Sequence, residues 1–135
     1  MATRERAAGG ARTGVIETKP RDLFQIFVAD VVAGGDTDTK NVGGVLPVGV
    51  IVKVTRLGGS DAGTGDGKAS TIALQIGGAG AWTTVWGFSV ASNTVDLPLS
   101  TTVTGDGTSR LRLVRVNASA DAKVITGWVE AHRVK

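Results

Sequence analysis

The chain has 135 residues, enough for one domain, and its 41% hydrophobic and 20% charged residues exclude wholesale disorder. It contains no cysteine, which excludes disulfides and thiolate metal sites. The 20 glycines are about twice the usual share, and they cluster between apolar runs, which excludes collagen and indicates many tight turns.

The N-terminal segment carries the net charge. Residues 1–21 hold five basic and two acidic residues, whereas the rest of the chain holds ten of each, so the formal charge of +3 belongs to this segment. Residues 1–14 are rich in Ala, Gly, Arg and Thr without a core-forming period, which predicts a flexible basic arm. Its candidate partner-binding residues are Arg4, Arg6 and Arg12; the alternative is a tail without function.

Charge and hydropathy also limit the partners. A folded part without net charge lacks the basic patch typical of a nucleic-acid reader, so we expect no specific nucleic-acid partner. No apolar run is long enough for a membrane span, and the N-terminus lacks the apolar region of a secretory signal. We therefore expect a protein made in the cytoplasm with no membrane partner.

Residues 15–135 are predicted to form one antiparallel β-sandwich. Short runs rich in Val, Ile, Thr and Trp alternate with turn-forming segments, and no convincing helix is present. In chain order the predicted strands are Gly14–Thr18, Leu23–Val32, Pro47–Leu57, Ser70–Ile76, Ala81–Ala91, Asp96–Leu99, Ser109–Asn117 and Lys123–Val134. Eight short strands predict an all-β, jelly-roll-like fold.

Two strands, Pro47–Leu57 and Ser70–Ile76, alternate cleanly between apolar and polar residues, which is typical of one buried and one wetted face. The predicted core includes Val50, Val52, Ile72, Leu74 and Trp86.

The strands Leu23–Val32 and Lys123–Val134 are apolar on both faces. A two-layer sandwich buries one face of each sheet, so the second face requires a neighbouring subunit, or else the arm and long loops. We favour a subunit and predict a homotrimer. The predicted subunit interface consists of Phe24, Ile26, Val28, Arg115 and Trp128.

The strand Ser109–Asn117 breaks its own alternation, because Arg115 falls on the side of Leu111 and Leu113. A β-bulge near Val114 would restore the register. The alternative is an interfacial Arg115 paired with a carboxylate.

Catalytic constellations are nearly absent, so we predict no enzyme and no cofactor. His132 is the only histidine, and no GxSxG-like nucleophile turn accompanies it. The carboxylate pairs Asp36/Asp38 and Asp61/Asp66 lie in glycine-rich turns, where aspartate commonly binds its own backbone. We predict no metal site; an irregular calcium loop at Asp61 and Asp66 is the alternative.

Trp82 and Trp86 are four residues apart in one predicted strand and should share a face with Phe88. The apolar continuation of that face favours a core position. The alternative is an exposed aromatic platform of the kind that binds sugars.

Three segments carry a family resemblance: Leu46-Pro47-Val48-Gly49-Val50-Ile51-Val52-Lys53-Val54, then Thr71-Ile72-Ala73-Leu74-Gln75-Ile76-Gly77, and finally Val124-Ile125-Thr126-Gly127-Trp128-Val129-Glu130-Ala131. Together they resemble the small jelly-roll decoration (cement) proteins of tailed-bacteriophage heads. The resemblance implies a non-enzymatic trimer that binds the major capsid protein at three-fold or quasi-three-fold positions and braces the shell. It places the protein on the capsid surface of a virion. Glu130 and His132 depart from the family's usual closing pattern.

The leading functional hypothesis is therefore capsid decoration. The alternatives are a carbohydrate-binding β-sandwich module and another phage component, such as a head fibre base, tail or baseplate protein.

Overall fold

The computed structural model describes residues 23–63 and 67–135. The predicted strand Gly14–Thr18, the boundary at residue 14 and the arm arginines Arg4, Arg6 and Arg12 lie outside the described residues.

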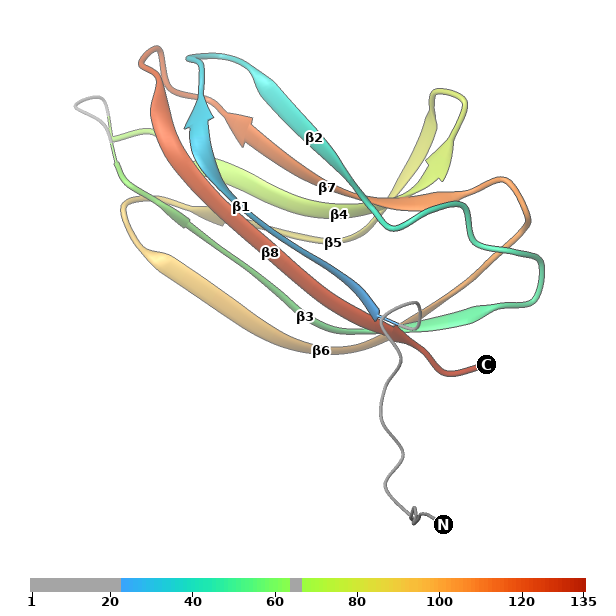
Figure 1. Cartoon of the computed structure of the whole chain (residues 1–135). Helices are drawn as coiled ribbons and strands as arrows, with labels where there is room; N and C mark the ends of the chain where they lie inside the picture. Colours follow the sequence, from blue (N-terminus) through green and yellow to red (C-terminus); the bar gives the residue numbers. More distant parts are fainter. Residues whose placement is uncertain (1–22, 64–66) are drawn as a thin grey trace, which may run out of the picture.

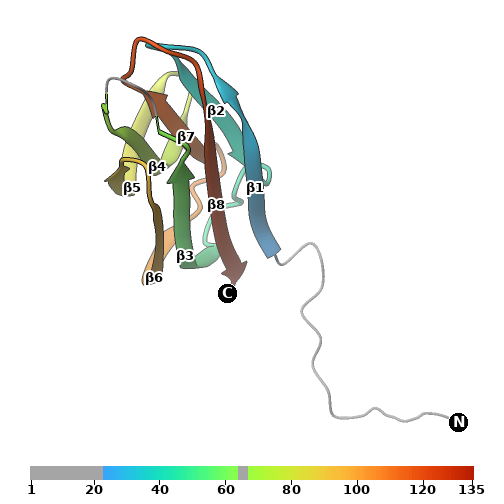
Figure 2. The same cartoon turned by 90° about the vertical axis from the view of Figure 1, so that its left-hand side faces the viewer.

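The described residues form an all-β sandwich of two four-stranded sheets (Figure 1). The strands are β1 (Leu23–Val32), β2 (Thr37–Val42), β3 (Ile51–Asp61), β4 (Ser70–Gly78), β5 (Ala81–Val90), β6 (Thr94–Thr104), β7 (Arg110–Asn117) and β8 (Lys123–Arg133). One sheet has the order β1-β8-β3-β6 and the other β2-β7-β4-β5, with every neighbouring pair antiparallel. This is the jelly-roll order, which confirms the predicted fold class. Figure 2 shows the two sheets as separate layers.

The core lies between the sheets and is aliphatic, with its largest buried apolar side chains from both layers: Leu46, Leu57, Ile72, Leu74, Leu111, Leu113 and Ile125. The predicted core residues Val50, Val52, Ile72 and Leu74 are buried, as expected. Trp86 is 46% exposed, so its predicted burial is wrong. It lies opposite Leu74 but on β5, an edge strand with no further strand beside it.

The strand β2 was not predicted, because its residues lie in a segment that was expected to form a turn. The strand reads TDTKNV, and only Val42 in it is fully buried. As an edge strand it pairs with β7 alone. A short polar edge strand carries no apolar alternation, so periodicity does not reveal it.

Glycines inside β3 explain another difference. The predicted strand ended at Leu57, but β3 continues through Gly58 and Gly59 to Asp61. A Cβ at Gly58 would lie 2.2 Å from the indole of Trp128, and a Cβ at Gly59 would lie 2.7 Å from the carbonyl oxygen of Thr126. The two glycines therefore mark close packing within a strand instead of a turn.

The register of β7 is continuous with both of its neighbours, so the bulge expected near Val114 is absent. Arg115 points between the sheets with the leucines of its face. Bulges occur instead in β3 and β5. Within the described residues there is no helix of the length and apolarity that a membrane crossing requires.

Candidate functional site

The outer face of the β1-β8-β3-β6 sheet carries a pair of aromatic rings. Phe27 on β1 and Trp128 on β8 are direct cross-strand partners. Their ring centroids are 5.9 Å apart and the ring planes differ by 13°, so the rings are nearly parallel. Phe27 is 68% exposed. Trp128 is half-buried. An exposed ring stacked on a second ring makes this sheet face a candidate binding surface.

Contacts from two further strands hold the indole of Trp128. The ring lies over Gly58 of β3, where any Cβ would overlap it. Its Nε1–H donates to Asp96 Oδ1 of β6 at 3.1 Å. Trp128, Gly58 and Asp96 occupy one row across the sheet, so the indole extends from β8 over β3 to β6. The ring is thus positioned before any ligand arrives.

Charged side chains border these rings. Arg56 of β3 forms a bidentate pair with Asp96, with Nε and NH2 each 2.8 Å from a carboxylate oxygen. Its NH1 lies 3.5 Å from Glu130 Oε2. The hydrogen bonds from Arg56, followed by that from the Trp128 indole, lower the pKa of Asp96 to about 2. Asp96 is therefore an anion at every physiological pH.

A hollow of about 500 Å³ adjoins the rings and the charged residues. Gln25, Phe27, Arg56, Trp128 and Glu130 line it, together with two apolar residues of β1 and β8. Its volume lies within the range of small-molecule sites, about 300–1,000 Å³. We call this set of residues the β1–β8 face.

The residues predicted for a subunit interface divide between the two sides of the sheet. Phe24, Ile26 and Val28 are half-buried and pack against the core, so they face inward and leave little surface for a subunit contact. These three residues alternate with Phe27 along β1, so they lie on the opposite side of the sheet from it. The register of the strand decides which of the two sides faces the core. Trp128 faces outward on the β1–β8 face.

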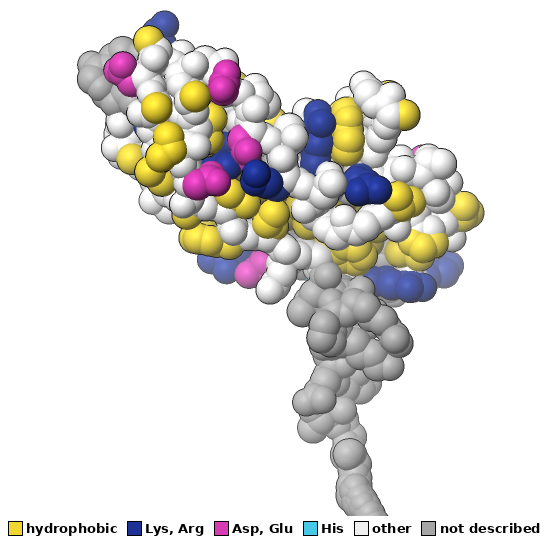
Figure 3. All heavy atoms as spheres, turned by 45° about the horizontal axis from the view of Figure 1, so that its top comes forward, with side chains coloured by type: hydrophobic (Ala, Val, Ile, Leu, Met, Phe, Trp, Pro, Cys, Tyr) yellow, Lys and Arg dark blue, Asp and Glu magenta, His cyan; other side chains and the backbone are white. Residues whose placement is uncertain are grey.

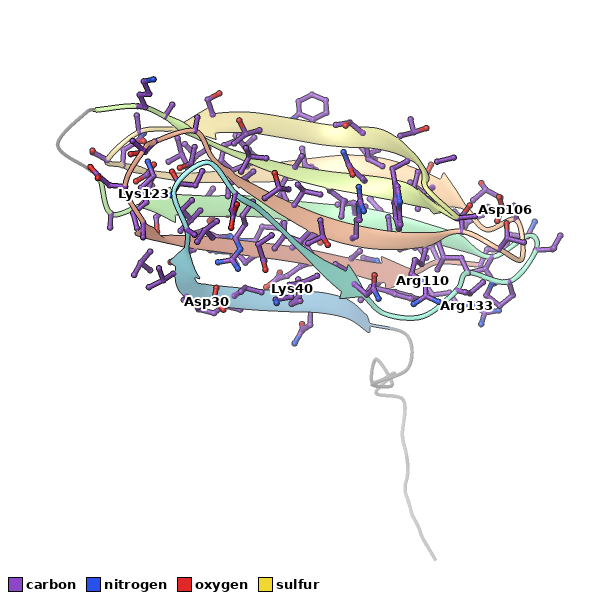
Figure 4. All side chains as sticks on the ribbon, turned by 90° about the horizontal axis from the view of Figure 1, so that it is seen from above. Asp30, Lys40, Asp106, Arg110, Lys123 and Arg133 are labelled. Atoms are coloured by element: carbon purple, nitrogen blue, oxygen red, sulfur yellow. The ribbon has the colours of Figure 1, made fainter. Side chains whose placement is uncertain are left out.

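Arg115 is only 1% exposed and so offers no surface to a subunit. Its NH2 lies 2.5 Å from Asp38 of β2 and 2.6 Å from Asp30 of β1, and its NH1 donates to the carbonyl of Ile125 at 2.6 Å. The predicted carboxylate pairing is present, but it joins the two sheets of one chain. Figure 4 shows Asp30 and Lys40 at the same edge of the sandwich. On this side of the molecule, acidic and basic side chains lie beside one another among hydrophobic ones (Figure 3).

Asp61, half of the alternative calcium site, is already paired. Its Oδ2 accepts from Lys123 Nζ at 2.7 Å and from Ser70 Oγ at 2.8 Å, and its Oδ1 accepts from the Gly63 N–H at 2.6 Å. Asp66 lies outside the described residues. In the described part of the chain, no three His, Asp or Glu side chains form a cluster that fits a metal ion.

We therefore expect a chelator to leave the melting temperature unchanged, because an ammonium group already neutralises Asp61. Thermal melts with 5 mM EDTA, and with 5 mM calcium, measure this. A shift of several degrees in either direction would show a metal site in the β3–β4 loop.

Two residues with catalytic potential, His132 and Asp38, have different surroundings. Within residues 23–63 and 67–135, the imidazole of His132 has no hydrogen-bond or ion-pair partner. Asp38 is committed to Arg115 and Lys40.

The two tryptophans of β5, Trp82 and Trp86, do not form an aromatic platform for a sugar. Trp82 pairs with Gly77 and Trp86 with Leu74, three residues apart on β4, so the two rings point to opposite faces. The bulge in β5 adds the residue that separates them. Trp82 lies instead beneath the guanidinium of Arg112, 3.9 Å from the ring centroid.

No protein-family model matches the sequence, and no curated protein does either. Three solved structures are similar in fold. The N-terminal cellulose-binding domain of Cellulomonas fimi β-1,4-glucanase C has 15% identity and a TM-score of 0.45 over 87% of this chain and 92% of that one. A chain of the disulfide-linked pili of Bacillus endospore appendages has 15% identity and a TM-score of 0.44 over 93% and 100%. PirA has 19% identity and a TM-score of 0.35 over 88% and 99%. Likenesses at this level assign no function.

Proposed function

We propose that this chain is a non-enzymatic structural protein that decorates and stabilises a bacteriophage capsid, as a trimer on the major capsid protein. The observation that carries the proposal is an exposed apolar tip at one end of the sandwich. The tip consists of Val45 and Val48 in the β2–β3 loop and Val134 after β8. Val48 is 79% exposed.

Turn chemistry accounts for the exposure of Val48. The Val50 N–H donates to the Pro47 carbonyl at 3.1 Å, and Gly49 has a φ of +81°. These features are those of a type II turn, which places Val48 at the corner and requires glycine or asparagine next to it. Leu46 is buried just before the turn and fixes it to the core. The motif that resembles the decoration proteins thus begins at the tip.

Backbone hydrogen bonds hold the tip rigid. The Leu46 N–H donates to Ser109 at 2.8 Å, the Gly105 N–H to Val50 at 2.7 Å, and the Val134 N–H to Ile51 at 2.9 Å. The β2–β3 loop, the β6–β7 loop and the C-terminus therefore form one unit. A rigid apolar projection loses little conformational entropy on binding, which suits attachment to another protein.

The surroundings of the tip suit an acidic protein surface. Two arginines and one aspartate, Arg110, Arg133 and Asp106, lie at this end of the sandwich (Figure 4), as does the start of β1 (Figure 1). The predicted arm, with Arg4, Arg6 and Arg12, precedes β1, so it would leave the domain beside the tip. In this proposal the arm and the tip bind the same capsid surface.

We expect Val48→Asp to weaken attachment to heads at least tenfold without changing the melting temperature. A charge at this corner is harmless in water but would have to be desolvated at an apolar contact. Co-sedimentation with purified heads that lack the protein measures the affinity. The control is Ser89→Asp, at an exposed position on β5. Equal binding by Val48→Asp and the wild type would contradict attachment through the tip.

Trimer formation requires a different surface from the one predicted. Val31 and Val124 are cross-strand partners on the outside of β1 and β8, and they are 63% and 41% exposed. We expect the protein at micromolar concentration to sediment as three chains, and Val31→Asp to sediment as one. Analytical ultracentrifugation measures both masses. A monomeric wild type would contradict the trimer and leave the tip to be tested alone.

A further inference from the structure

We propose that the β1–β8 face is a binding site for a neutral carbohydrate chain. This inference does not rest on capsid decoration. Attachment through the tip leaves the face open, but the proposed trimer contact at Val31 and Val124 lies on the same side of β1 and β8, so the test below includes the oligomeric state. It concerns Phe27 and Trp128 with the polar residues beside them, Gln25, Arg56 and Glu130.

The aromatic rings supply the apolar part of such a site. One face of a pyranose ring presents C–H groups, which carry a slight positive charge and pack against the negative face of an aromatic ring. Phe27 and Trp128 offer two nearly parallel rings with centroids 5.9 Å apart. Because the two rings are stacked on one another, they offer one aromatic surface to a sugar unit, with the exposed Phe27 ring as its accessible part.

The position of Trp128 is fixed in advance. Gly58 provides the space beneath the indole, and Asp96 accepts its N–H. A ring held from two strands loses little freedom when a ligand binds, which favours affinity. The three atoms nearest to a Cβ at position 58 all belong to the indole of Trp128.

The polar residues supply both kinds of hydrogen-bonding group that hydroxyls need. Arg56 donates, Glu130 accepts, and the amide of Gln25 does both. Gln25 and Glu130 are cross-strand partners and exposed, and Arg56 is the partner of Glu130 on its other side. The three side chains therefore form a row beside the row of the rings.

The charged side chains next to the rings favour a neutral ligand over an anionic one. Around the rings, within residues 23–63 and 67–135, Asp96 and Glu130 both pair with the guanidinium of Arg56. Two carboxylates against one cation repel phosphates and uronic acids. A single-stranded nucleic acid also stacks on aromatic rings, but it requires a basic groove. The balance favours a neutral glycan.

The test is isothermal titration of the full chain with neutral oligosaccharides: cellohexaose, xylohexaose, mannohexaose and N-acetylchitohexaose. Polygalacturonate and an oligo(dT) serve as anionic probes. We expect at least one neutral hexaose to bind and neither anionic probe to do so. We expect Phe27→Ala to weaken that binding at least tenfold with an unchanged melting temperature. Gly58→Ala, which displaces the indole without removing it, should have the same effect.

The matched control is Trp86→Ala, which removes an exposed aromatic ring from the other sheet and should bind the glycan like the wild type. Failure of all four hexaoses at millimolar concentration would overturn the proposal, as would equal losses in Phe27→Ala and Trp86→Ala. A drop from trimer to monomer in Phe27→Ala would show that the face is a subunit contact. Binding of oligo(dT) alone would assign it to nucleic acid.

Discussion

Val52→Asp is expected to abolish folding. Val52 lies on β3, a central strand, and its side chain is fully buried in the core between the two sheets. An aspartate there would bury an unpaired charge, which costs about 4–5 kcal/mol or more. That cost is comparable with the whole stability of a small domain, about 5–15 kcal/mol. Loss of the cooperative melt and of the β-sheet circular dichroism signal would show it.

The matched control is Lys53→Asp, one residue further along β3. Its side chain lies on the outer face, opposite His132 and Thr102. We expect this variant to fold with a melting temperature within a few degrees of the wild type. If Val52→Asp melted like Lys53→Asp, the register of β3 would be wrong by one residue.

The second large effect is expected from Lys123→Met. The Nζ of Lys123 lies 2.7 Å from Asp61 and donates to the carbonyl of Lys68 at 2.9 Å. The Lys123 and Asp61 side chains are almost completely buried. Removing the cation leaves a buried carboxylate without a counter-charge, a change that typically costs about 3–5 kcal/mol. Urea denaturation at pH 7 measures the loss of unfolding free energy.

The double variant Asp61→Asn/Lys123→Met is the control for this pair. Asparagine keeps an acceptor for the Gly63 N–H and a partner for Ser70, while removing the charge. We expect the double variant to recover most of the lost stability. If it were no more stable than Lys123→Met, packing of the lysine stem and not the charge would explain the loss.

The pair also predicts a dependence on pH. Burial alone would raise the pKa of Asp61, but the hydrogen bonds from Lys123, Gly63 and Ser70 outweigh it and lower the pKa. Its contribution to stability is therefore present above the unfolded value, about 3.9, and is lost as the pH falls through the folded value. In Lys123→Met the Asp61 carboxylate has lost its counter-charge, so its protonation removes a buried, unpaired charge and restores part of the lost stability. The difference between the two proteins should shrink in acid.

Much of the fold follows from local patterns. The alternation in the predicted strands Ser70–Ile76 and Pro47–Leu57 identified most of β4 and the first half of β3 and correctly placed Val52, Ile72 and Leu74 in the core, because a strand with one dry face repeats every two residues. The same reasoning failed for β2 and for Trp86. β2 is an edge strand and Trp86 lies on another, β5. An edge strand has no neighbour on one side, so its polar residues need not alternate with apolar ones and its apolar residues need not be buried.

The sequence predicted only part of the candidate site. The predicted strands Leu23–Val32 and Lys123–Val134 have apolar residues on both faces, which predicted a second apolar face besides the core, and Phe27 and Val31 are indeed exposed there. Alternation separates Phe24, Ile26 and Val28 from Phe27, but it does not say which group faces the core. The interface was consequently assigned to the inward group.

By itself, the sequence determined the fold class, the aliphatic core of the central strands and the absence of any cysteine chemistry, since these depend on composition and local period. Only the tertiary structure decided that Phe27 meets Trp128, that Gly58 makes room for the indole, and that Arg115 joins Asp30 to Asp38 inside the sandwich. Each of these contacts joins residues distant in the chain. Their pairing is set by strand order and register, which a local period does not encode.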